Sequence, residues 1–147
     1  MSTTATGGDE RKMILVVDDA PSNIRIVNEI LHNSYKVRIA TSGTKALELA
    51  SSTPGPDLIL LDIGLPKLNG IEAARQIRRI APKSKILFVS ENRSWHIVEE
   101  ALRSGGDGYV IKADAVTDLL PAVKAVLQGK RFVIGSFAQV EGSSTAQ

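Results

Sequence analysis

Acidic side chains follow two of the apolar runs in this sequence, at the point where each run ends. The run "MILVV" leads into Asp18 and Asp19, and "LILL" leads into Asp62. Two later runs also end in reactive groups: "KILFVS" ends in Ser90, and "GYVI" is followed by Lys112. Carboxylates, a hydroxyl and an ammonium group can together hold a cation and a phosphoryl group. These residues can act together only if the fold brings the ends of the runs to one place.

The apolar runs alternate five times with segments of helical periodicity, which predicts strands and helices in turn. The expected strands cover residues 13–17, 35–40, 58–61, 85–90 and 108–111. The expected helices cover residues 22–31, 44–50, 69–81, 94–106 and 117–129. This order predicts an α/β fold, a doubly wound five-stranded parallel sheet with helices on both faces, in a single domain.

Polar residues mark the expected helix starts. Ser22 is a plausible cap of the first helix, and Asn69 with Glu72 three residues later forms a capping-box pattern. The last helix is expected to begin near Thr117, because Pro121 is then tolerated within about the first turn.

In such a sheet, ligands bind at the carboxyl ends of the strands, so Asp18, Asp19 and Asp62 are expected to converge. At ~5 Å and an effective dielectric near 20, each pair of these charges repels by roughly 3 kcal/mol. A hard cation bound by oxygen ligands relieves this repulsion, and Mg²⁺ is the natural choice. No Ser–His pair is evident, so a carboxylate is the expected nucleophile, with Asp62 the best candidate. Gly64 can offer its backbone carbonyl to the metal.

Bulk composition indicates an ordinary soluble globular domain. The 147 residues are 43% hydrophobic and 23% charged, with a net charge of +2 and no cysteine. The charge is too small to indicate nucleic-acid or membrane binding by itself, and disulfide and thiolate metal sites are excluded. No apolar run approaches the roughly 20 residues that a membrane span needs, so a cytoplasmic location is expected. Residues 1–11 are expected to form a disordered arm, 12–130 the folded domain, and 131–147 a tail or linker.

The sequence resembles the receiver domains of response regulators, the CheY-like family, over about residues 12–129. The motifs that carry the resemblance are "VVDDAP", "LILLDIGLPKLNG", "FVS" and "GYVIK". The segment from "ALRSGG" to "LQGKRF" is similar to receivers of the NarL/LuxR branch, which usually carry a helix-turn-helix domain behind the receiver.

The resemblance implies a role for each matched residue. Asp62 is the phospho-acceptor, Asp19 is a direct Mg²⁺ ligand, and Asp18 helps through water. Gly64 supplies a carbonyl ligand, and Lys112 binds the phosphoryl group. The switch residues are Ser90 and Tyr109, and Asn92 modulates hydrolysis of the acyl phosphate.

Two departures from the family pattern stand beside these motifs. Glu91 replaces the small residue that usually follows the switch hydroxyl, and it would oppose a phosphoryl group if its carboxylate faced the pocket. The alternative is that Glu91 points to solvent. Lys112 precedes Ala113 rather than the proline of many receivers, and a trans peptide bond is expected because a cis bond costs ~3 kcal/mol.

The expected function is that of a regulatory phosphoacceptor in two-component signalling rather than an enzyme. A histidine kinase or phosphotransfer protein would phosphorylate Asp62, Tyr109 would then turn inward, and the surface of residues 94–106, 108–111 and 117–129 would change. Homodimerisation on phosphorylation is an open expectation, and no direct contact with nucleic acid or membrane is expected.

Three alternatives stay open. The first is the receiver fragment of a NarL-type DNA-binding regulator. The second is a binding module whose phosphorylation is impaired by Glu91. The third, a haloacid-dehalogenase-type phosphatase, is disfavoured because Gly64 occupies the position of the second aspartate in that family's Asp-x-Asp pattern.

Overall fold

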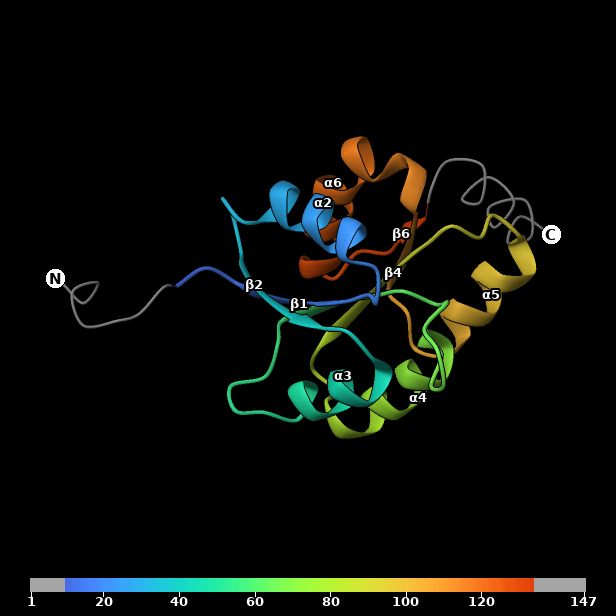
Figure 1. Cartoon of the computed structure of the whole chain (residues 1–147), viewed down its shortest axis with the longest axis horizontal. Coiled ribbons are helices and arrows are strands. Elements are labelled where there is room, and N and C mark those ends of the chain that lie inside the picture. Colours follow the sequence, from blue (N-terminus) through green and yellow to red (C-terminus); the bar gives the residue numbers. More distant parts are fainter. Residues whose placement is uncertain (1–9, 134–147) are drawn as a thin grey trace, which may run out of the picture.

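The computed structural model describes residues 10–133. These residues form one sheet with helices on both of its faces (Figure 1). The strands are β1 (Met13–Val17), β2 (Lys36–Ala40), β3 (Leu58–Leu61), β4 (Lys85–Ser90), β5 (Gly108–Ile111) and β6 (Phe132–Val133). The helices are α2 (Pro21–Leu31), α3 (Gly43–Ala50), α4 (Gly70–Ile80), α5 (Trp95–Arg103) and α6 (Ala115–Leu127), with a 3₁₀ turn, η1, at Lys112–Asp114.

All the strand pairs are parallel, and the strand order is β2-β1-β3-β4-β5-β6. After β2 the chain returns to the other side of β1, so the strand order reverses between β1 and β3. The predicted doubly wound parallel fold is therefore confirmed. The loops that follow β1 and β3 meet at the reversal point, which is where ligands bind in sheets of this kind.

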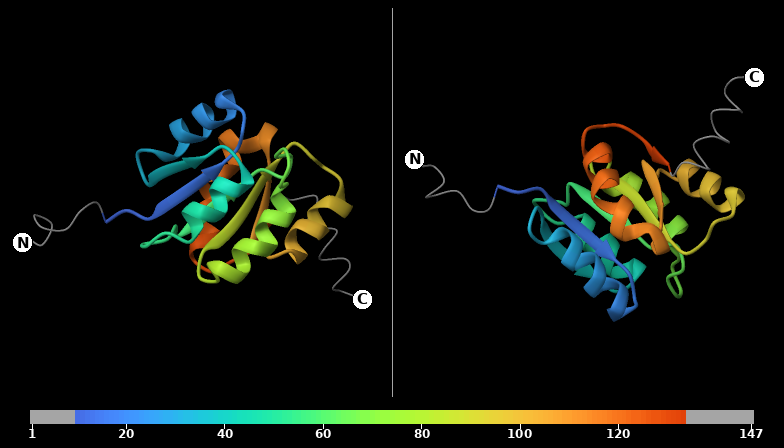
Figure 2. Two further views of the ribbon diagram at one scale, coloured as in Figure 1. Left: turned by 60° about the horizontal axis from the view of Figure 1, so that its bottom comes forward. Right: turned by 90° about the horizontal axis from the view of Figure 1, so that it is seen from above.

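The two faces of the sheet bury separate clusters. Along β1, Leu15 and Val17 belong to one core cluster and Ile14 and Val16 to the other, because successive side chains of a strand point to opposite faces. Helices α3, α4 and α5 cover the first cluster, and α2 and α6 cover the second (Figures 1 and 2). The central strand β3 is buried along its whole length, which explains its unbroken run of aliphatic residues.

The number of strands was wrong by one. Five strands were expected and residues 131–147 were expected to form a tail, but Phe132–Val133 pairs with β5 as a sixth strand. A strand of two residues has no periodicity that a sequence could show, and it forms because α6 returns the chain to the sheet edge. The proposed domain boundaries stay a prediction, since residues 1–9 and 134–147 lie outside the described residues.

Two predicted helix starts were also wrong. Helix α2 begins at Pro21, and its N-cap is Ala20 rather than Ser22. Helix α6 begins at Ala115, so Pro121 lies in the helix interior rather than near its first turn. The 3₁₀ turn after Lys112 starts the helical winding early. Pro121 is tolerated because it lies on the exposed side of α6, where water can satisfy the carbonyl group that loses its amide partner.

The helix start at Asn69 is as expected. The Asn69 side chain accepts a hydrogen bond from the Glu72 amide at 3.0 Å. Gly70 follows directly, and a Cβ atom at this position would clash with the backbone carbonyl of Asp62. The absence of a side chain at Gly70 therefore lets α4 start against the end of β3, which fixes the backbone of Asp62.

Candidate functional site

The backbone places Asp18 and Asp62 at the carboxyl ends of two adjacent strands. The Asp18 amide donates to the Ala40 carbonyl at 3.1 Å, and the Asp62 amide donates to the Val17 carbonyl at 3.1 Å. Both residues therefore continue the ladders that β1 forms with its neighbours. Their side chains project from rigid strand ends rather than from a free loop.

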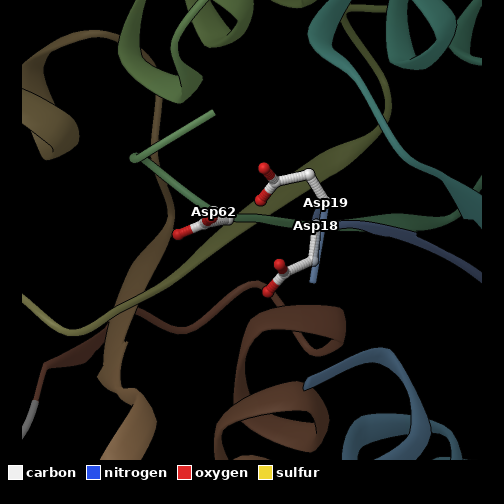
Figure 3. A group of neighbouring side chains, drawn as sticks. All are labelled: Asp18, Asp19 and Asp62. Carbon is white, nitrogen blue, oxygen red and sulfur yellow. The ribbon is translucent and has the colours of Figure 1, made fainter. Parts of the chain in front are cut away.

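Three carboxylates converge at this edge (Figure 3). Each of Asp18, Asp19 and Asp62 offers one oxygen, and these oxygens lie within 4.8 Å of one another. Asp18 and Asp62 are buried and Asp19 is exposed. The carboxylate cluster is thus open to solvent at Asp19 and shielded from solvent at Asp18 and Asp62.

Lys112 links the two buried carboxylates. Its Nζ atom lies 3.0 Å from Asp18 Oδ2 and 3.3 Å from Asp62 Oδ1. Burial by itself lowers the pKa of the Lys112 ammonium. The hydrogen bond to Asp18 and the charges of Asp62 and Asp18 outweigh burial, so the pKa of Lys112 lies above its usual value. Lys112 is therefore a permanent cation at neutral pH.

The same cluster acts differently on Asp62. Burial raises the pKa of its carboxyl group, and the negative charge of Asp18 raises it further. Lys112 and the Gly64 amide, which donates to Asp62 Oδ1 at 3.3 Å, lower the pKa but do not offset burial. The net pKa of Asp62 is raised, which marks a carboxylate that an additional cation would stabilise.

The donors that line this edge fit a hard cation. Three carboxylates face one ammonium group, so the cluster keeps an excess of negative charge. Carboxylate oxygens beside a face that is open to solvent suit Mg²⁺, because this ion usually retains several water molecules. Gly64 is exposed, and nothing lies within 4 Å of the position that a Cβ atom would occupy there. Its backbone is therefore accessible to a hydrated cation.

The hollow above the carboxylates has a volume of about 510 Å³, which is ample for a hydrated cation and a phosphoryl group. Besides the acidic cluster, the hollow is lined by residues that end or follow β1, β3, β4 and β5, namely Ala20, Asn23, Ile63, Gly64, Ser90, Glu91, Asn92 and Lys112. Glu91 is exposed and lies at this hollow, so neither of its two expected orientations is eliminated.

Asn23 was not among the predicted site residues, yet it lines the hollow from the first turn of α2. It also lines a small, mostly apolar cavity of about 50 Å³ beneath the carboxylates. Its position four residues after Asp19, in the turn that follows the strand, is the only signal that could have indicated it.

Ser90 and Tyr109 are joined through the backbone of Asn92. The Asn92 amide donates to Ser90 Oγ at 3.1 Å, and the Tyr109 hydroxyl donates to the Asn92 carbonyl at 2.9 Å. Burial raises the pKa of the Tyr109 phenol, a hydrogen bond from the Ser90 side chain lowers it, and the charge of Asp62 raises it. The Tyr109 hydroxyl therefore interacts electrostatically with the Asp62 carboxylate.

Tyr109 is completely buried, and its ring lies 6.4 Å from that of Phe88. The inward position, which we expected to accompany phosphorylation, is thus the position that the structure has. The Lys112–Ala113 peptide bond is trans, as expected, because Thr53–Pro54 holds the only cis bond within residues 10–133.

Comparison with known proteins agrees with this geometry. The family model described as "Response regulator receiver domain" matches residues 14–124. The transcriptional activator protein ExaE of Pseudomonas putida is 37% identical over 82% of this chain and 57% of its own length. The nitrate/nitrite response regulator protein NarL of Escherichia coli is 30% identical over 92% of this chain and 63% of its own length. The chain thus spans somewhat more than half the length of these relatives.

Two solved structures have the same fold. A two-component response regulator of the LuxR family from Aurantimonas superposes with a TM-score of 0.84, at 28% identity over 94% of this chain and 100% of the other. The signal receiver domain of a NarL regulator from Mycobacterium tuberculosis superposes with a TM-score of 0.75, at 30% identity over 83% of this chain and 100% of the other.

Every helix within residues 10–133 is too short or too polar to span a membrane.

The matched motifs lie on the strand ends that build the acidic cluster, and the family model covers most of the chain. The chain belongs to the response regulator receiver domains of two-component systems, and it is a regulatory domain rather than a conventional enzyme.

Proposed function

We propose that Asp62 accepts a phosphoryl group from the phosphohistidine of a sensor histidine kinase or phosphotransfer protein. The observation that carries this proposal is the position of Lys112, whose Nζ atom contacts Asp18 and Asp62 at 3.0 and 3.3 Å at the open hollow. A cation held against a buried carboxylate fits a site that must bind an incoming anion.

In the proposed reaction an Asp62 oxygen attacks phosphorus in line, and the O–P bond forms as the N–P bond of phosphohistidine breaks. The electron pair of the N–P bond becomes the lone pair of the imidazole nitrogen, and the histidine side chain is the leaving group. Lys112 pairs with one phosphoryl oxygen and Ser90 donates its hydroxyl to another. Asp18, Asp19, Asp62 and the Gly64 carbonyl would hold Mg²⁺, which neutralises charge on the phosphoryl oxygens when bound.

The product would add roughly two negative charges to the hollow. To donate to a phosphoryl oxygen, Ser90 must turn away from the Asn92 amide, which it now contacts at 3.1 Å. This movement would reach Tyr109 through Asn92 and then the surface formed by α5, β5 and α6. We propose that this surface carries the signal to a partner or to a second copy of the chain, as a shift between two conformations.

The direct test is mass spectrometry after incubation with Mg²⁺ and phosphoramidate, a small donor with the N–P bond of phosphohistidine. We expect the mass of one phosphoryl group on Asp62, its loss in Asp62→Ala, and weaker Mg²⁺ binding in Asp19→Ala. Equal labelling of the wild-type protein and Asp62→Ala would show that the acceptor is another residue.

A second proposal concerns the output. The relatives include proteins named as transcriptional regulators, and the chain spans about half of their length. This favours a receiver that regulates DNA binding by a further domain, without contacting nucleic acid itself. Reading the gene beyond the codon for Gln147 tests this directly, because a following helix-turn-helix sequence supports the proposal and a stop codon contradicts it. Under either reading the protein is proposed to act in the cytoplasm.

A further inference from the structure

The sixth strand lies beside the residue that links β5 to the phosphoacceptor site. In the parallel β5–β6 pair, Val133 is the register partner of Tyr109, and Phe132 is the partner of Gly108 (Figure 2, red strand beside β5). Tyr109 belongs to the core cluster under α3, α4 and α5, and Val133 packs against the same cluster. Phe132 packs against the cluster on the opposite face.

The pairing puts the Val133 side chain at the edge over which the Tyr109 ring would leave the core. Side chains of register partners project from the same face of a sheet, and adjacent strands lie about 4.8 Å apart. A ring on β5 that turns outward passes over the neighbouring edge position, which Val133 fills. We propose that Val133 is a positioning residue that holds Tyr109 in its inward conformation and thereby favours phosphoryl binding at Asp62.

Two glycines, Gly129 and Gly108, allow β6 to pair with the edge of β5. Gly129 has a φ of +85°, and its amide and that of Lys130 bond to the Val126 and Ala125 carbonyls at 2.9 Å each. This glycine-dependent ending turns the chain back at the end of α6. Gly108 allows the close approach, because a Cβ atom at Gly108 would lie only 2.8 Å from the Phe132 carbonyl oxygen.

The β6 pairing is weak enough to respond to a change at the site. It covers two residues, both only partly buried, and the Phe132 amide reaches the Asp107 carbonyl at 3.4 Å. Tyr109 meanwhile bonds to Asn92, whose amide bonds to Ser90. A continuous set of contacts thus joins Val133 to the hydroxyl that would hold the phosphoryl group. Because coupling between two sites is reciprocal, holding the ring inward and binding a phosphoryl group should favour each other.

The position of the ring can be measured without any phosphoryl chemistry. The protein has two tyrosines, so 3-fluorotyrosine in a Tyr35→Phe background gives one fluorine resonance from Tyr109. We expect a soluble gadolinium chelate to broaden this resonance much more in Val133→Ala than in the parent protein. Val133→Thr keeps the shape of the side chain and is the matched control, which should leave the resonance protected. Equal protection in Val133→Ala would overturn the proposal.

The second measurement tests the link to the site and rests on the proposed function. Beryllofluoride with Mg²⁺ is titrated against the full chain, and Val133→Ala should bind it about fivefold more weakly, at the lower end of typical couplings. In a Tyr109→Ala background the same substitution should have no effect, because no ring remains to be held. A fluorine change without an affinity change would overturn the link between Val133 and the site.

The two measurements separate the two failures. If the parent protein does not bind beryllofluoride through Asp62, the proposed function fails. The fluorine experiment still decides whether Val133 holds the ring. If the parent binds and both Val133 variants bind equally well, the link between Val133 and the site fails and the phosphoacceptor function stands.

Discussion

Replacing Asp62 with asparagine should stabilise the protein against unfolding when no divalent cation is present. The asparagine side chain would keep the shape of the aspartate and could still accept from the Gly64 amide, but it would carry no charge. Lys112 would remain paired with Asp18 at 3.0 Å. The substitution therefore isolates the free energy that the negative charge of Asp62 costs the fold.

The magnitude follows from the distances. At an effective dielectric of 20, Lys112 at 3.3 Å attracts the Asp62 carboxylate by about 5 kcal/mol, and a like charge at the upper limit of 4.8 Å repels it by about 3.5 kcal/mol. Two carboxylates, Asp18 and Asp19, repel it, although the repulsion from exposed Asp19 is screened by solvent. The attraction by Lys112 exceeds the repulsion by Asp18, so the cost of the charge comes mainly from burial, which raises the pKa of Asp62 despite Lys112. Burial of a polar group without full compensation costs about 1–3 kcal/mol. The substitution should therefore raise the melting temperature by roughly 5 °C.

The gain depends on pH in a definite direction. The pKa of Asp62 is raised in the folded protein above the ordinary value of 3.8. Well below pH 3.8 the carboxyl group is neutral in both the folded and the unfolded chain, so Asp62→Asn and the wild-type protein should be equally stable there. As the pH rises from 3.8 to the folded pKa, the wild-type protein loses stability relative to the variant, and the gain reaches its full size above the folded pKa.

The assay is thermal and urea unfolding in EDTA and then in Mg²⁺. Added Mg²⁺ should stabilise the wild-type protein, by about 2.7 kcal/mol at a hundred times the dissociation constant, and the variant by less. Asp107→Asn is the matched control. The Asp107 carboxylate accepts from the Ile86 amide at 2.9 Å and contacts Arg78 at 3.3 Å. Asparagine could still accept from the Ile86 amide but would lose the charge that faces Arg78, so this substitution should destabilise by up to about 1 kcal/mol. An Asp62→Asn protein that melts at or below the wild-type temperature in EDTA would refute the reasoning.

Three further predictions concern single residues. Lys112→Met removes the charge that lowers the pKa of Asp62, so phosphoramidate labelling should fall at least about tenfold and its pH profile should shift upward; an unshifted profile would contradict this. Glu91→Ala should raise beryllofluoride affinity severalfold by removing a like charge at the hollow, whereas equal affinity would show that Glu91 faces away. Lys67 has a φ of +66°, which is strained for a residue with a side chain. Lys67→Gly should therefore raise the free energy of unfolding, measured with urea, by about 0.5–1 kcal/mol. A free energy of unfolding below that of the wild-type protein would exclude backbone strain at this position.

Much of the fold could be predicted because its signals are local. The run that forms β3 is apolar throughout, since both faces of a central parallel strand are buried, and Asp62 follows at its end. The alternation of strands and helices determined the parallel topology. The rule for the carboxyl ends of strands then predicted that Asp18, Asp19 and Asp62 would meet, and the structure brings them within 4.8 Å.

What only the tertiary structure decided depends on contacts between residues far apart in the chain. Lys112 could be placed at the right edge from the sequence, but its simultaneous contacts with Asp18 and Asp62 depend on how β5 and η1 pack beside β1 and β3. Nothing in the sequence near Tyr109 shows whether its ring lies inward.

Strand β6 is the clearest case. Phe132 and Val133 have no periodic pattern, and they become a strand only because α6 ends at a left-handed glycine beside the free edge of β5. A sequence determines local conformation and the burial pattern of long elements, because these depend on neighbouring residues. Short pairings and side-chain orientations depend on the assembled surface on which they form.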